Sequence, residues 1–171
     1  LGLLAISILR ALGFCNIVAC DVDEDKLDVA ISQGATKRVR SDRSGADVAL
    51  RAIVGDRLVG VVDFVGRPET FSFAYPVVRR GGAYIMVGLY GGDVLLSLPP
   101  IAQRAISISG SYVGTLQELV SVVELARSGR LRPTPITVRS PEEVNDALRV
   151  LERGAGIGRT VLDFSSVEAK P

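Results

Sequence analysis

The sequence contains no histidine. This absence excludes a Ser-His-Asp triad, a Cys-His pair and any zinc site that needs an imidazole from this chain. The two cysteines, Cys15 and Cys20, are five positions apart, a spacing that fits neither a C-x-x-C metal motif nor a disulfide scaffold. We therefore interpret both as small buried thiols. We predict no catalytic residue and no metal ligand in this chain.

Neither sign of charge dominates, and no apolar run is long. Twenty Lys and Arg against 19 Asp and Glu give a net charge of +1, and the charges are scattered, so we expect no nucleic-acid partner. The longest apolar run, residues 1–14, is broken by Arg10 and is too short to span a bilayer. It also lacks the features of a signal peptide. We expect no membrane association and a cytoplasmic location.

What is present is a core-forming chain in which helix and strand patterns alternate. It has 171 residues, of which 47% are hydrophobic, enough for a substantial core. Helical patterns cover residues 1–12, 24–33, 46–53 and 67–78, and strand patterns cover 16–20, 37–40, 60–66 and 83–88. The strand at 60–66 reads as buried on both faces. This alternation predicts an α/β fold with a doubly wound parallel sheet.

The later part of the chain changes character. We expect an extended piece at 94–98 ended by Pro99-Pro100, a strand at 105–113, and a helix at 115–127. The buried side of that helix is predicted to carry Leu116, Leu119, Val120, Val123 and Ala126. After a proline-containing linker, a strand at 136–139, a helix at 140–152 with a Ser140/Glu143 capping box, and a strand at 159–164 complete the fold. Residues 165–171 read as a frayed tail.

Asp21 is the most informative single residue. It stands where the strand at 16–20 ends, 19 residues after Gly2, close to the separation expected in a dinucleotide-binding unit. A carboxylate there can accept both hydroxyls of an adenosine ribose and would repel a 2′-phosphate, which favours NAD over NADP. The alternative is an aspartate that only starts a turn. Gly2 would be the last glycine of a G-x-G-x-x-G turn, whose opening glycines and preceding strand are not in this sequence.

Three further features have both a functional and a structural interpretation. Val65-Gly66 and Val87-Gly88 close two predicted parallel strands at the edge where such sheets bind ligands, although turn glycines are common anyway. Arg159 follows a glycine-rich lead-in and could hold a phosphate, or could be a solvated strand-edge arginine. Ser111 and Tyr112 could face a cofactor, but neither has an adjacent base in the sequence.

Six stretches, in this order, resemble the zinc-dependent alcohol dehydrogenases of the medium-chain dehydrogenase/reductase family. They are LGLLAISILRALG, IVACDVDEDKLDVAISQGAT, GVVDFVG, GGAYIMVGLYGG, ISISGSYVGT and GIGRTVLDF. The resemblance covers nearly the whole chain. It implies a Rossmann-type sheet that lacks its first strand over residues 1–133. It also implies that residues 134–171 form a segment packing on a preceding catalytic domain that this sequence does not contain.

The resemblance also implies roles for individual residues. Asp21 resembles the ribose-binding aspartate, and Lys26 the lysine beside that ribose. The segment that lines the adenosine is matched by residues that resemble it: Val65, Gly66 and Arg67. The backbone that holds the nicotinamide carboxamide is matched likewise by Val87, Gly88 and Leu89, helped by Ser111, Tyr112 and Val113. Arg159 resembles the arginine that reaches the pyrophosphate.

On this resemblance the chain is expected to be the cofactor-binding portion of an NAD-dependent alcohol dehydrogenase. The substrate would be an alcohol or carbonyl compound, and zinc is expected only in the missing catalytic domain. A homodimer or dimer of dimers is implied through residues 105–113. Two alternatives stay open: a zinc-independent quinone or enoyl reductase of the same family, and a non-catalytic nucleotide-binding or dimerisation module.

Overall fold

The structure is a computed structural model, and it describes residues 1–165. The chain divides into two compact units, residues 1–131 and the part from Arg132 onward. The tail predicted at 165–171 lies, beyond its first residue, outside the described residues. Within residues 1–165, no helix is both long and apolar enough to cross a membrane.

The first unit alternates strands and helices as the sequence pattern predicts. Its helices are α1 (Gly2–Ala11), α2 (Glu24–Gln33), α3 (Ala46–Val54), α4 (Pro68–Ala74), the 3₁₀ turn η1 (Tyr75–Val77), α5 (Leu98–Arg104) and α6 (Leu116–Arg127). Its strands are β1 (Val18–Asp21), β2 (Lys37–Arg40), β3 (Gly60–Asp63), β4 (Ala83–Met86) and β5 (Ser107–Gly110). The predicted α2 and β2 match the structure residue for residue.

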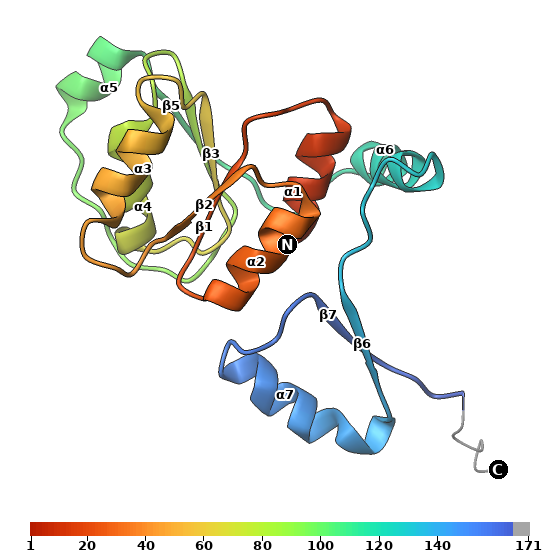
Figure 1. The fold of residues 1–171 in the computed structure, drawn as a ribbon. Coiled ribbons are helices and arrows are strands. Elements are labelled where there is room, and N and C mark those ends of the chain that lie inside the picture. The colour runs from red at the N-terminus through yellow and green to blue at the C-terminus, as the bar shows by residue number, and fades with distance from the viewer. Residues whose placement is uncertain (166–171) are drawn as a thin grey trace. The chain divides into compact units, whose positions relative to one another are not determined.

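The strands of this unit form two parallel ladders. β1 pairs with β2, and β3, β4 and β5 pair in that order. No hydrogen-bonded pairing of described strands joins β1 to β3, so the parallel sheet is interrupted there. This is the Rossmann-type α/β arrangement expected, with its gap where a first strand would lie. Figure 1 shows α1 and α2 on one side of the strands and α3 and α4 on the other.

Three buried clusters hold the layers together. Leu27 and Ala30 of α2 pack with Ile17 and Ala19, supported by the apolar face of α1. On the other side, Leu50 of α3 belongs to a second cluster. A third cluster surrounds Tyr84 of β4, which is fully buried. The last two clusters share Leu58, which lies just before β3, so the packing is continuous between them.

The second unit is a small parallel β-helix-β element. It contains β6 (Ile136–Arg139), the 3₁₀ turn η2 (Pro141–Glu143), α7 (Val144–Glu152) and β7 (Arg159–Leu162), with β6 and β7 paired in parallel. The predicted Ser140/Glu143 capping box is present, because the Glu143 carboxylate accepts a hydrogen bond from the Ser140 N–H at 2.9 Å.

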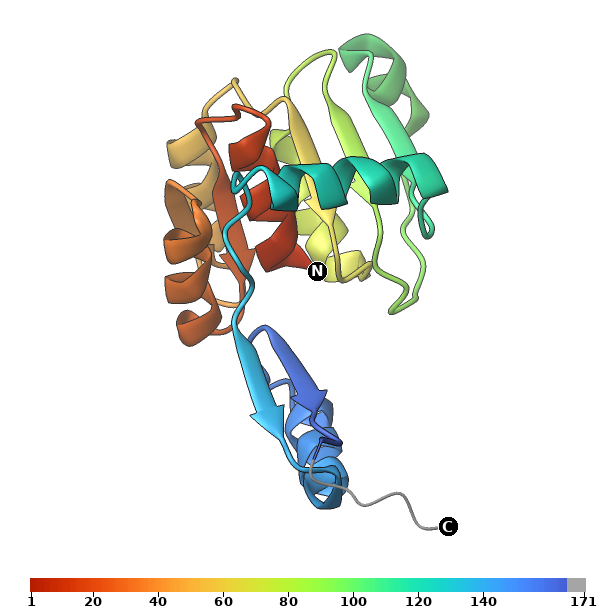
Figure 2. The same cartoon turned by 90° about the vertical axis from the view of Figure 1, so that its right-hand side faces the viewer.

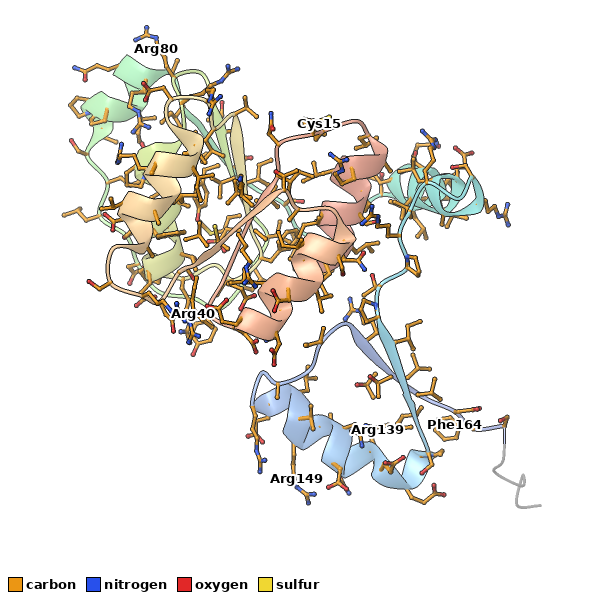
Figure 3. All side chains as sticks on the ribbon, in the orientation of Figure 1. Cys15, Arg40, Arg80, Arg139, Arg149 and Phe164 are labelled. Carbon is orange, nitrogen blue, oxygen red and sulfur yellow. The ribbon has the colours of Figure 1, made fainter. Side chains whose placement is uncertain are left out.

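Four predictions about local structure are wrong. Residues 94–98 form no described strand, and Pro99-Pro100 do not end an element but lie in the first turn of α5, where a missing N–H costs nothing. β3 is not buried on both faces, since Val62 on the side away from α4 is 41% exposed. Cys15 and Cys20 are exposed rather than buried. Cys20 points to the opposite face of β1 from buried Ala19, and Figure 3 shows Cys15 in the loop after α1.

The fourth wrong prediction concerns α6. Its apolar stripe was expected to be buried, yet Leu116 and Leu119 are 77% and 60% exposed, and Val120, Val123 and Ala126 are exposed as well. Leu125 is the residue of α6 that is buried. In Figure 2, α6 crosses in front of α1 on the same side of the sheet. Within the described residues, α6 is therefore covered only along the side that carries Leu125.

Candidate functional site

The carboxyl ends of the parallel strands are where the predicted site residues of the first unit gather. Asp21 is the last residue of β1 and is half-buried. Its Oδ1 atom accepts a hydrogen bond from the N–H of Asp23 at 3.1 Å. No hydrogen bond within residues 1–165 engages Oδ2. One carboxylate oxygen thus fixes the turn, and the other accepts no hydrogen bond from the described residues.

Two glycine turns follow β3 and β4 and pass unusually close to each other. A Cβ atom built on Gly66 would lie 2.1 Å from the carbonyl oxygen of Gly88, and one on Gly88 would lie 2.1 Å from the carbonyl carbon of Val65. Gly66 also has a φ of +72°, a conformation that glycine adopts without strain. No side chain fits at either position, so the backbone of both turns is bare on this edge.

Arg67 connects the same two turns through its side chain. Its guanidinium carbon lies 3.4 Å from the ring centroid of Tyr90, a cation–π contact between the turn after β3 and the segment after β4. The Tyr90 N–H donates to the carbonyl of Val65 at 3.1 Å. The buried Nε atom of Arg67 has no hydrogen-bond partner among the described residues. The cation–π contact therefore holds Arg67 at the edge of the site.

The segment after β5 is largely exposed. Tyr112 and Val113 are 76% and 82% exposed, and the Ser111 N–H donates to the carbonyl of Met86 at 2.8 Å. Val113 has a φ of +53°, which a β-branched residue rarely adopts. Such strain is concentrated in proteins at functional segments.

The other predicted residues are less tightly placed. Gly2 begins α1, and a Cβ there would meet Phe64 at an ordinary 3.8 Å, so the described residues do not demand glycine. Lys26 lies in the first turn of α2 with its Nζ 4.0 Å from an oxygen of Asp23. Leu89 is 77% exposed. Arg159 begins β7 of the second unit, where its N–H donates to the carbonyl of Pro135.

Asp63 is a residue of this edge that the sequence reasoning missed. It is the last residue of β3, is only 6% exposed, and accepts four hydrogen bonds through its carboxylate. Burial by itself raises the pKa of Asp63, but the hydrogen bonds to the charged form outweigh burial and lower it. One signal was available: an acidic residue at the end of a buried β-branched strand needs partners.

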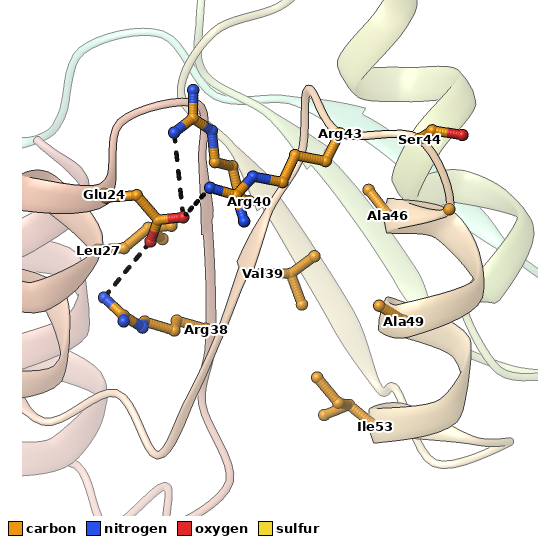
Figure 4. A pocket seen from close by; sticks show the side chains of 11 residues that line it. Glu24, Leu27, Arg38, Val39, Arg40, Arg43, Ser44, Ala46, Ala49 and Ile53 are labelled. Carbon is orange, nitrogen blue, oxygen red and sulfur yellow. Dashed lines mark ion pairs between the residues drawn. The ribbon is translucent and has the colours of Figure 1, made fainter.

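A pocket of about 360 Å³ lies elsewhere, beside β2. Figure 4 shows its polar wall, where Glu24 pairs with Arg43 at 3.0 Å, Arg38 at 3.6 Å and Arg40 at 4.0 Å. Arg40 also pairs with Asp42, and Arg38 with Asp28. Three carboxylates thus balance three guanidinium groups. None of the predicted site residues lines this pocket, and its charges are already satisfied internally.

The fit of the implied metal and cofactor can be tested on these residues. Within the described part of the chain, no three His, Cys, Asp or Glu side chains come together as a metal site. These residues do not fit zinc. A dinucleotide fits better, because Asp21 offers a carboxylate oxygen and the paired glycines leave a bare backbone edge.

Comparison with known proteins gives a consistent result. The family model described as zinc-binding dehydrogenase matches residues 1–128. The NAD-dependent alcohol dehydrogenase of Sulfolobus acidocaldarius is 36% identical over an alignment of 171 positions, gaps included, that covers 95% of this chain and 47% of that protein. The Sulfurisphaera tokodaii protein of the same name is 31% identical over 163 residues, with the same coverage.

A solved structure shows the same relationship in three dimensions. The alcohol dehydrogenase of Aeropyrum pernix superposes with a TM-score of 0.82 at 31% identity, over 93% of this chain and 46% of that one. The chain therefore spans about half the length of the relatives it matches.

Proposed function

This chain belongs to the zinc-binding dehydrogenase family, and on that premise we propose that it is the cofactor-binding portion of an NAD-dependent alcohol dehydrogenase. The observation that carries the proposal is the carboxyl edge of the sheet, where Asp21 and the bare backbones of Gly66 and Gly88 lie at the ends of parallel strands. Residues 1–133 would bind the dinucleotide. Residues 134–171 would pack on a catalytic domain.

The adenosine end of NAD would lie between β1 and the turn after β3. The carboxylate of Asp21 would accept the ribose hydroxyls and repel a 2′-phosphate, with Lys26 beside the ribose. Val65, Gly66 and Arg67 would line the adenosine.

The nicotinamide end would lie over the turns after β4 and β5. The N–H groups of Val87 and Gly88 already donate to the carbonyl of Asp63, at 2.8 and 3.0 Å. A carboxamide would therefore meet their carbonyl oxygens and the segment from Ser111 to Val113. Arg159 would reach the pyrophosphate.

When bound, NAD supplies the nicotinamide C4 that accepts or gives up a hydride as an alcohol and a carbonyl compound interconvert. The residues of this chain would bind and orient the cofactor, and zinc would belong to the catalytic domain. We expect negligible alcohol turnover by residues 1–171 alone. Measurable turnover by the purified chain would contradict this division of labour.

The parent protein would dimerise through residues 105–113. β5 ends the β3-β4-β5 ladder, and all four of its residues are exposed, so one edge of the strand offers unpaired backbone groups. Ile108→Lys in the parent would place a charge on this edge and shift the protein to monomers in analytical ultracentrifugation. A parent that stays dimeric with this change would rule out the interface. The cytoplasmic location predicted from the sequence stays a prediction.

The cofactor preference tests the proposed function. In calorimetric titrations of the chain, NAD⁺ is expected to bind more tightly than NADP⁺, and Asp21→Asn to weaken NAD⁺ binding about tenfold, as for the loss of one charge-assisted hydrogen bond. Asp25→Asn, an exposed change in the first turn of α2, is the matched control and should leave both affinities unchanged. Tighter NADP⁺ binding would favour the quinone or enoyl reductase, and binding of neither nucleotide would contradict the proposal.

A further inference from the structure

The side chain of Asp63 is aimed at the turn that follows it. Its Oδ1 atom accepts hydrogen bonds from the N–H groups of Val65 at 2.9 Å and Gly66 at 3.0 Å. These two donors belong to the turn whose backbone passes closest to Gly88. Because hydrogen bonds to a carboxylate are about twice as strong as neutral ones, Oδ1 fixes the direction of this turn.

The second oxygen of Asp63 is held from the opposite direction. Oδ2 accepts from the Thr70 hydroxyl at 2.6 Å and from the Tyr84 hydroxyl at 2.8 Å. Thr70 in turn accepts a hydrogen bond from the N–H of Arg67 at 3.1 Å. A carboxylate offers about four acceptor positions, and all four are used here. Asp63 therefore has no position left for a ligand.

The main chain of Asp63 holds the neighbouring turn. Its carbonyl oxygen accepts from the N–H groups of Val87 and Gly88. The Gly91 N–H donates to the Gly66 carbonyl at 3.2 Å, which joins the two turns a second time. One buried residue thus ties together both segments that the proposed function assigns to the cofactor.

We propose that Asp63 is a positioning residue, which sets the Val65–Gly66–Arg67 turn against the Gly88 turn in the geometry that receives the adenosine end of a nicotinamide dinucleotide. This inference rests on the proposed function. A buried carboxylate is costly, and an apolar residue would fill a structural position at lower cost. At Asp63, all four of the backbone N–H groups bound by its side chain and carbonyl belong to the Val-Gly pairs of the two turns.

The test compares three variants of the full chain. Asp63→Asn keeps the shape but weakens the hydrogen bonds to Val65 and Gly66, and Thr70→Val removes the acceptor for Arg67. Tyr84→Phe is the matched control, because it removes one hydrogen bond from the same carboxylate without touching a donor in the turn. Each variant is measured by NAD⁺ titration, by thermal unfolding, and by the amide NMR signals of Val65 and Gly66.

We expect Asp63→Asn and Thr70→Val to raise the Kd for NAD⁺ about tenfold. Tyr84→Phe should leave the Kd within about threefold of the wild-type value even though it lowers the unfolding temperature. The Val65 and Gly66 amide signals should move in Asp63→Asn while that of Gly110 stays in place. If Asp63→Asn does not fold, Thr70→Val provides the comparison.

Different results would contradict the proposed function and the role of Asp63. Wild-type chain that binds no NAD⁺ contradicts the proposed function and this inference with it. Wild-type chain that binds NAD⁺ while Asp63→Asn or Thr70→Val binds equally well overturns the inference alone. Affinity losses that follow the loss of stability in all three variants, the control included, show a structural role only and also overturn it.

Discussion

Gly66 and Gly88, 22 residues apart in the chain, approach each other so closely that a Cβ atom on Gly66 would lie 2.1 Å from the carbonyl oxygen of Gly88. Real Cβ atoms do not come so near to backbone. The contact explains why a Val-Gly pair follows each strand: glycine allows the two turns to approach closely, and backbone rather than side chains then faces the carboxyl edge.

Gly88→Ala tests this contact alone, because Gly88 does not have a positive φ. We expect its free energy of unfolding in urea to fall by about 1–3 kcal/mol or more, as for other overpacked sites. Gly110→Ala is the control, since it lies at the end of β5 with no atom within 4 Å of an added Cβ. It should change stability by no more than about 0.5 kcal/mol. Equal effects of the two changes would refute the close approach.

Tyr84 should make the chain sensitive to alkali. Burial, followed by its hydrogen bond to Asp63, raises the pKa of the Tyr84 hydroxyl above its usual range. Below about pH 10, where an unfolded tyrosine stays neutral, the stabilisation is fully present, and it is lost as the pH rises toward the folded-state pKa. Unfolding free energies measured across this range should fall in the wild type and fall less in Tyr84→Phe. Parallel curves for the two proteins would show that Tyr84 carries no such linkage.

Val113 should be a site where glycine stabilises the chain. Its φ of +53° is costly for a β-branched residue, and its 82% exposed side chain buries little apolar surface. We expect Val113→Gly to raise the free energy of unfolding by roughly 1 kcal/mol, the usual cost of a left-handed residue. Val94→Gly, at a position without a positive φ, should lower it instead. A loss of stability in Val113→Gly would show that the segment is not strained.

The two sides of α6 should respond differently to truncation. Leu125 is 8% exposed, so Leu125→Ala should cost about 2 kcal/mol or more in the free energy of unfolding. Leu119 is 60% exposed, and Leu119→Ala should cost no more than about 0.5 kcal/mol in the same chain. Denaturant titration of the two matched variants gives the comparison. A large loss in Leu119→Ala would mean that the apolar stripe is covered in solution.

Local signals were the best guide to the fold. Asp23 caps α2 by accepting from the N–H groups of Asp25 and Lys26, and Gly34 ends it in the left-handed conformation, and both residue types are those that favour these helix ends. The prediction that Pro99-Pro100 end an extended piece is wrong because proline both ends extended segments and opens helices. Only the following residues, which continue as α5, distinguish the two cases.

Contacts between residues far apart in the chain could not be predicted from the sequence. The stripe on α6 has the apolar composition of a buried face, but periodicity does not say whether a partner is present in this chain. The same limit applies to Asp63, whose partner Tyr84 is 21 residues away on another strand. The alternating pattern predicts that the strands are parallel neighbours. It does not predict which polar groups meet across them.

NAD⁺ binding at the carboxyl edge is tested most directly by an amide NMR map of the full chain titrated with NAD⁺. We expect the shifted signals to cluster at that edge: around Asp21, in the turns containing Gly66 and Gly88, and in the segment 111–113. Shifts confined to the pocket beside β2, around Arg38, Arg40 and Arg43, would contradict it, as would a spectrum that NAD⁺ leaves unchanged.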